Sequence, residues 1–108
     1  MKIITLHNRI DPNELREHIR QNLNPLFSKQ RQSELKFTVG GSGNIIEISQ
    51  PDLYEGVLFH IEVKSDELHI TRSEHYVDDV NSLTAESILN DLFKDVAKKN
   101  GTDLIQEG

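Results

Sequence analysis

The sequence contains no cysteine and no tryptophan among its 108 residues. The lack of cysteine excludes disulfides, thiolate metal sites and a cysteine nucleophile, and it is in keeping with a reducing compartment. No stretch approaches the roughly 20 apolar residues of a membrane helix. The apolar run at residues 2–6 is too short for a signal peptide, and no cleavage-site pattern follows it. We therefore expect a cytoplasmic protein.

Hydrophobic residues are also scarce, at 35% of the chain, which is below the usual globular share. The core should therefore be modest, so stability could depend on a second copy or on a partner. The apolar residues that are present recur with strong periodicity, which argues against disorder. The length predicts a single domain covering residues 1–108.

Positive charge is in deficit, and the deficit is uneven. Residues 1–40 carry seven basic and four acidic side chains, a balance of +3, whereas residues 41–108 carry five basic and fourteen acidic ones, a balance of −9. The resulting net charge of −6 disfavours binding to DNA or RNA. It suits a basic protein partner. Acidic charge also keeps a small domain soluble, and charge taken alone favours that simpler explanation.

Two segments have helical periodicity. Asp11 and Pro12 are typical of a helix start, and an apolar stripe follows at Leu15, Ile19, Leu23, Leu26 and Phe27. Pro25 predicts that this first helix ends or kinks near residues 23–24. The second helix is expected to begin at Thr84 or Ser82 and to end at Asn100-Gly101. Its apolar stripe consists of Ala85, Ile88, Leu89, Leu92, Phe93 and Val96.

Two hairpins are predicted between the helices. The first joins a strand at 35–39 to one at 44–50 through the glycine-rich turn 40–43. That turn predicts two apolar pairs on one face of the hairpin, Phe37 with Ile46 and Leu35 with Ile48, and Lys36 opposite Glu47 on the other.

The second hairpin has the most regular alternation of the chain, from residue 57 to residue 63, with a tight turn at Ser65-Asp66. This turn predicts the apolar pairs Val63 with Leu68 and Ile61 with Ile70. On the other face it predicts the polar pairs Glu62 with His69, Lys64 with Glu67, and His60 with Thr71.

Together these elements predict an α+β domain, a two-layer sandwich. A four-stranded antiparallel sheet made of two hairpins carries an N-terminal and a C-terminal helix on one face. Residues 2–6 are predicted as a short additional strand or an ordered arm. The other face of the sheet, or an edge strand, is left to water or to another molecule.

Three side chains on the predicted polar face, His60, Glu62 and His69, could hold a divalent metal. The alternative, a solvated face with a Glu–His pair, is favoured. The glycine turn lacks the following helix of a phosphate loop, and no serine lies in a nucleophile elbow. We therefore expect no cofactor or metal, and a binding protein rather than an enzyme.

The topology brings the loop 50–56 and the segment 73–81 to one end of the sheet. Aromatic side chains ringed by carboxylates are typical of an interface to a basic protein. The residues predicted to bind a partner are Asp52, Tyr54, Glu55, Glu74, His75, Tyr76, Asp78 and Asp79. In the alternative, these are two polar loops whose tyrosines fold back on the core.

These features lead to three hypotheses. The first is a small acidic domain that binds and neutralises a basic protein, as an immunity protein or antitoxin does. The second is an acidic dimer of the secretion-chaperone or adaptor type that docks an extended client. The third is a small-ligand or metal-binding domain or an enzyme. The sequence leaves open whether the chain forms a homodimer.

Overall fold

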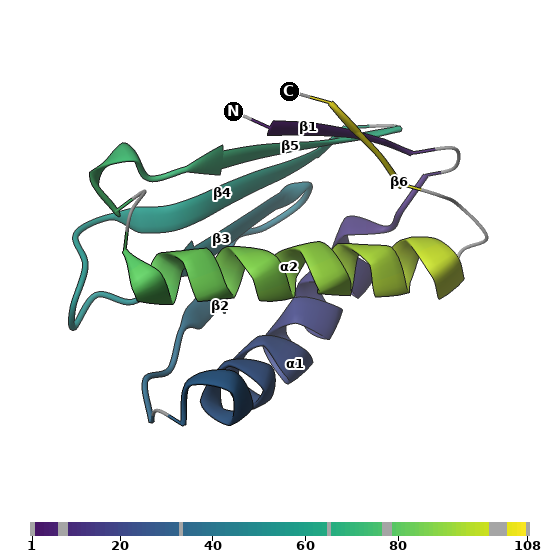
Figure 1. Ribbon diagram of the computed structural model, residues 1–108. Coiled ribbons are helices and arrows are strands. Elements are labelled where there is room, and N and C mark those ends of the chain that lie inside the picture. Colours follow the sequence, from purple (N-terminus) through teal and green to yellow (C-terminus); the bar gives the residue numbers. More distant parts are fainter. Residues whose placement is uncertain are drawn as a thin grey trace.

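In the computed structural model the chain forms an α+β sandwich of two layers (Figure 1). One layer is an antiparallel six-stranded sheet in the order β2-β3-β4-β5-β1-β6, and the other consists of two helices on the same side of it. The structure describes residues 2–6, 9–32, 34–64, 66–76, 79–99 and 104–107.

The predicted fold class is confirmed, and the sheet is wider than the two hairpins. The elements are β1 (Lys2–Leu6), α1 (Pro12–Arg31), β2 (Thr38–Gly40), β3 (Ile45–Ser49), β4 (Val57–Lys64), β5 (Glu67–Arg72), the 3-10 helix η1 (Glu74–Tyr76), α2 (Val80–Lys99) and β6 (Leu104–Glu107). The strand expected at residues 2–6 is present and lies between β5 and β6. Strand β6 was not predicted. Within the described part of the chain, neither helix has the apolar length needed to span a bilayer.

Helix α1 begins as predicted and ends later. The Oδ1 atom of Asp11 accepts a hydrogen bond from the backbone N–H of Asn13 at 3.0 Å, and Pro12 occupies the first turn. Of the end or kink predicted near residues 23–24, the end is wrong, because the helix continues to Arg31. Pro25 lies on the exposed side, where water can satisfy the carbonyl that loses its partner.

Helix α2 begins earlier than either predicted cap. The Oδ2 atom of Asp79 accepts a hydrogen bond from the backbone N–H of Ser82 at 2.9 Å, so Asp79 is the N-cap. Its negative charge also suits the positive end of the helix. Thr84 lies inside the helix, where its hydroxyl donates to the carbonyl of Val80 at 2.9 Å. The helix end predicted at Asn100-Gly101 lies outside the described residues.

The two hairpins differ in how well their register was predicted. All five pairs expected between β4 and β5 are confirmed. The register between β2 and β3 was wrong, because Val39, not Leu35, lies opposite Ile48. Helix α1 causes the change: Asn24 accepts a 2.7 Å hydrogen bond from the N–H of Phe37 and donates a 3.0 Å bond to its carbonyl. These bonds occupy backbone groups that the predicted strand would have used for β3.

A β-bulge interrupts the regular alternation of β4. Phe59 lies opposite Ile48, but the next pair is Val57 with Ser49, so Leu58 is an extra residue without a partner on β3. Leu58 and Phe59 are both fully buried, whereas Val57 is 36% exposed. The predicted alternation from residue 57 to residue 63 would place Val57 on the inner face with Phe59, and the bulge is the reason that it does not lie there.

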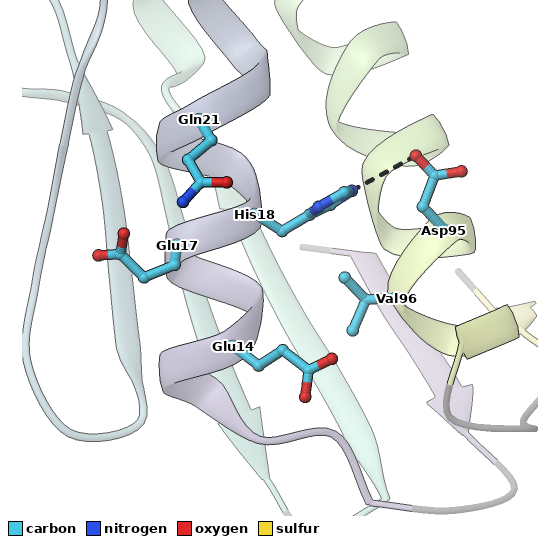
Figure 2. Close-up of a pocket in the computed structure, with 6 residues that line it drawn as sticks. All are labelled: Glu14, Glu17, His18, Gln21, Asp95 and Val96. Carbon is cyan, nitrogen blue, oxygen red and sulfur yellow. Dashed lines mark hydrogen bonds and ion pairs between the residues drawn. The ribbon is translucent and has the colours of Figure 1, made fainter.

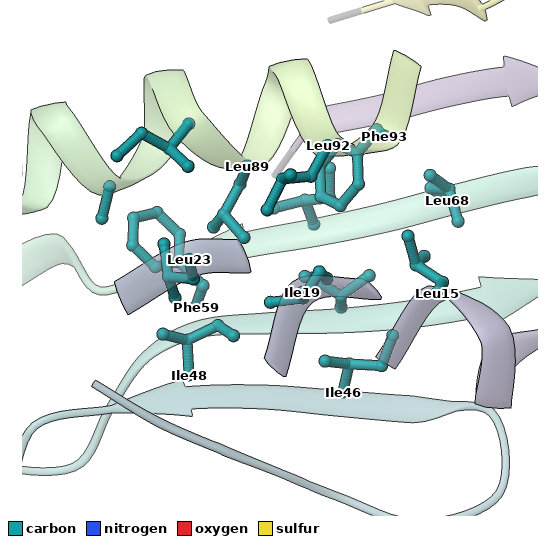
Figure 3. Packing of buried hydrophobic residues seen from close by; sticks show 14 of the residues in the cluster. Leu15, Ile19, Leu23, Ile46, Ile48, Phe59, Leu68, Leu89, Leu92 and Phe93 are labelled. Atoms are coloured by element: carbon teal, nitrogen blue, oxygen red, sulfur yellow. The ribbon is translucent and has the colours of Figure 1, made fainter. Parts of the chain in front are cut away.

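The core lies between the helices and one face of the sheet (Figure 3). The labelled side chains, all buried, come from both helices and from β3, β4 and β5: Leu15, Ile19, Leu23, Ile46, Ile48, Phe59, Leu68, Leu89, Leu92 and Phe93. The buried apolar side chains are therefore concentrated between the helices and one face of the sheet, and the opposite face carries His60, Glu62 and His69.

A buried arginine fastens the first hairpin to α1. Arg16 is only 8% exposed, and its guanidinium donates to the carbonyls of Gly43 at 2.7 Å and Ile45 at 3.1 Å. It also donates to the side chain of Asn13 at 2.7 Å. The glycine-rich turn thus supplies main-chain acceptors for a charge that would otherwise be poorly solvated.

We predict that Gly41→Ala destabilises the protein by about 1–3 kcal/mol. Gly41 has a φ of +103°, and a Cβ there would overlap the carbonyl oxygen of Ile45. Urea unfolding measures the effect. Gly40→Ala is the matched control, because no atom lies within 4 Å of its added Cβ, and its free energy of unfolding should change by less than about 0.5 kcal/mol. Equal losses in the two variants would contradict the argument.

Candidate protein-binding surface

The loop that follows β3 and the segment that follows β5 lie at one end of the sheet (Figure 1). Strands β4 and β5 are antiparallel neighbours, with Phe59 opposite Arg72, so the start of one adjoins the end of the other. The backbone N–H of Ser73 donates to the carbonyl of Leu58 at 2.8 Å and extends this contact. We call the loop 50–56 and the described part of the segment 73–79 the acidic end.

Tyr54 connects the two parts of the acidic end. It is only 8% exposed, and its hydroxyl donates to Oδ2 of Asp79 at 2.8 Å and accepts from Nδ2 of Asn81 at 3.2 Å. For this tyrosine the structure shows the alternative in which the ring folds back on the core. Tyr54 therefore supports the surface from beneath and is not an exposed aromatic contact.

Asp79 also has a structural role. The same Oδ2 atom that accepts from Tyr54 accepts the capping hydrogen bond from Ser82. One carboxylate thus joins the loop 50–56 to the first turn of α2. Its side chain is half-buried.

Gln50 shapes the loop from its other side. This side chain is 5% exposed. Its Oε1 accepts from the backbone N–H of Leu53 at 2.9 Å, and its Nε2 donates to the carbonyl of Lys36 at 3.2 Å. The loop is therefore held at Leu53 and at Tyr54, two consecutive residues.

The remaining predicted partner-binding residues are on the surface or outside the description. Asp52, Glu55, Glu74 and His75 are exposed at the acidic end. Tyr76 lies in η1, and its side chain is outside what the structure describes, as is the whole of Asp78. The structure thus brings three exposed carboxylates to one end of the molecule.

Exposed apolar side chains gather at the same end. Among the described residues, the large hydrophobic side chains that are exposed are Leu53 at 59%, Val80 at 53%, Leu83 at 44% and Val57 at 36%. The Tyr54 hydroxyl bonds to the residues on both sides of Val80, so the loop that carries Leu53 is joined to the first turn of α2. We call Leu53, Val80 and Leu83 the apolar patch.

The predicted end contained Leu53 and, within the segment 73–81, Val80, but Leu83 lay outside it and no apolar patch was predicted. A helix that starts at Val80 turns Val80 and Leu83 away from the stripe that begins with Ala85. The sequence signal for this start was Asp79 itself, since aspartate is a preferred N-cap residue.

The metal site considered on the open sheet face is not assembled. The Nδ1 atom of His60 lies 3.5 Å from Oε2 of Glu47, and the Nε2 atom of His69 lies 2.9 Å from Oε1 of Glu67. Glu62 lies 3.5 Å from Lys64. In the described part of the chain no group of three or more histidine, aspartate or glutamate side chains is arranged to hold a metal. The arrangement is that of a solvated face with carboxylate–imidazole pairs.

A second acidic feature lies between the helices (Figure 2). A pocket of about 210 Å³ is lined by Glu14, Glu17, His18, Gln21, Asp95 and Val96. Figure 2 shows His18 directed at α2, where its Nε2 lies 3.4 Å from Oδ2 of Asp95. Glu17 points away from α2. The imidazole thus links the two helices at the rim of the pocket.

Comparison with known proteins identifies no relative: no family model, curated protein or solved structure matches the chain.

We predict that Tyr54→Phe lowers the free energy of unfolding by about 1–3 kcal/mol, because the lost hydrogen bond has a charged acceptor. The loop 50–56 should also exchange its amide hydrogens faster. Urea unfolding and hydrogen exchange measure the two effects. Asp91→Asn, a change at an exposed position of α2, is the control and should be neutral. Unchanged exchange in the loop would show that Tyr54 does not hold it.

Proposed function

We propose that this chain is a small acidic domain that binds a basic protein and neutralises it, in the manner of an immunity protein or antitoxin. One observation carries the proposal. Asp52 and Glu55 flank the exposed Leu53 in the loop 50–56, and Tyr54 joins this loop to the first turn of α2, where Val80 is exposed. A nonpolar centre bordered by charged groups is typical of protein interfaces, and exposed apolar patches mark interaction sites.

The charge of the chain supports a basic partner. The net charge is −6, and Asp52, Glu55 and Glu74 are exposed at the acidic end. Opposite charge on a partner raises the association rate by about tenfold to a thousandfold at low salt. A protein that must inactivate a basic partner quickly benefits from such steering.

The test uses the basic proteins encoded by neighbouring genes, each purified and titrated against the full chain. We expect one of them to form a stable complex and to lose its own activity in it. Its association rate should fall at least about tenfold between low and high salt, because salt screens the attraction. Failure of every basic neighbour to bind, or an association rate that ignores salt, would contradict the proposal.

A pair of charge variants locates the attraction. Asp52→Asn with Glu74→Gln removes two exposed carboxylates of the acidic end and should slow association several-fold, with little effect on dissociation. The matched control, Asp66→Asn with Asp91→Asn, also removes two exposed carboxylates. Asp66 lies in the β4–β5 turn at the opposite end of the sheet, and Asp91 lies farther along α2. Stopped-flow fluorescence measures both rates, and equal slowing by the two variants would argue against this surface.

A further inference from the structure

The apolar patch faces away from the core. Val80 and Leu83 lie one helical turn apart, on the side of α2 opposite to Ala85 and Leu89, which are buried. Leu53 belongs to the loop that Tyr54 joins to the first turn of α2 through Asp79 and Asn81. Each of the three patch residues is more than two-fifths exposed, so a partner could remove a substantial apolar area from water.

The patch is organised before any partner arrives. The backbone N–H of Leu53 is bound by Gln50, and the neighbouring Tyr54 is bound to the start of α2. Val80 and Leu83 are part of a capped helix. A surface that is already ordered loses little conformational freedom on binding, so more of its apolar contact appears as affinity.

Charge selects the occupant of the patch. A second copy of this chain would bring its own Asp52, Glu55 and Glu74 against the same three carboxylates in a two-fold contact, and like charges in contact are unfavourable. A partner surface that presents lysine or arginine around a nonpolar side chain would instead bring positive charges against these three carboxylates, which is favourable.

We infer that the apolar patch is the binding site for a nonpolar side chain of the basic partner, and that lysine or arginine borders this side chain on the partner. This inference rests on the proposed function. The carboxylates of the acidic end set the rate of association, and Leu53, Val80 and Leu83 set the rate of dissociation. The two roles differ because the two interactions differ in range. Electrostatic attraction acts across solvent before the proteins touch, whereas apolar contact forms only after they dock.

Val57 provides an internal control. Val57 is exposed at the same end of the sheet. It pairs with Ser49 on β3, and the residue before Ser49, Ile48, is fully buried on the core face. Side chains alternate along a strand, so Val57 faces the open side of the sheet and lies off the apolar patch. A contact made by the patch should be insensitive to Val57→Thr, a change that keeps the β-branch.

The experiment uses the full chain and two probes of equal positive charge, an oligolysine peptide and a peptide that alternates leucine with lysine. We expect the leucine–lysine peptide to bind at least about tenfold more tightly. Methyl NMR should shift the signals of Leu53, Val80 and Leu83 and leave that of Val57 unchanged. Leu53→Ser with Leu83→Ser should speed dissociation about tenfold and remove the preference between probes, whereas Val57→Thr should do neither.

The outcomes separate the two proposals. If both peptides bind equally and the patch methyls do not move, the inference fails and the electrostatic proposal stands. If neither peptide binds at low salt, both fail. If the leucine–lysine peptide shifts the methyl signals of Val57 or of the open sheet face and not those of the apolar patch, the binding site has been assigned wrongly. Circular dichroism of the serine variants confirms that they fold, as substitutions at exposed positions should.

Discussion

The structure depends on one constraint: the sheet has a single apolar face, and that face must be covered. Hydrophobic residues are 35% of the chain, and the described ones that are buried form one cluster between helices and sheet. Both helices therefore lie on the same side, and the other side keeps its paired charges in water. The chain must also pass from the strand layer to the helix layer, and the acidic end includes one such crossing, from β5 to α2.

The sequence predicted those parts of the fold in which local pattern and turn agree. In the β4–β5 hairpin, alternation on both strands and a short turn allow one register, so each of the five predicted pairs is observed. The β2–β3 register was not predicted, because Asn24 of α1 takes both backbone groups of Phe37. A side chain 13 residues away leaves no mark on the alternation of the strand. Pro25 misled for a related reason: an exposed proline in a helix whose other face is well packed costs less than the helix gains.

At the candidate surface, the sequence predicted where the exposed carboxylates lie, but it assigned partner binding to Tyr54 and Asp79, which have structural roles. Asp52, Glu55 and Glu74 are exposed as a polar loop predicts. Tyr54 and Asp79 instead bond to each other, since a buried phenol needs an acceptor and a helix start needs a cap. Residue type shows what a group can do, and only the fold shows which donor or acceptor is nearest. The bulge at Leu58 and the early start of α2, which expose Val57, Val80 and Leu83, were hidden for the same reason.

Strand β1 lies between β5 and β6, the last two strands of the chain. Of the six strands of the sheet, β1 is synthesised first, and it is therefore without either neighbour until some sixty residues later, when β5 follows it. Helix α1 and the hairpins can form from contacts close in sequence, but the half of the sheet that contains β1 must wait for chain closure over most of the domain. During synthesis β1 thus passes through a stage in which both of its edges are unpaired and open to pairing with other chains.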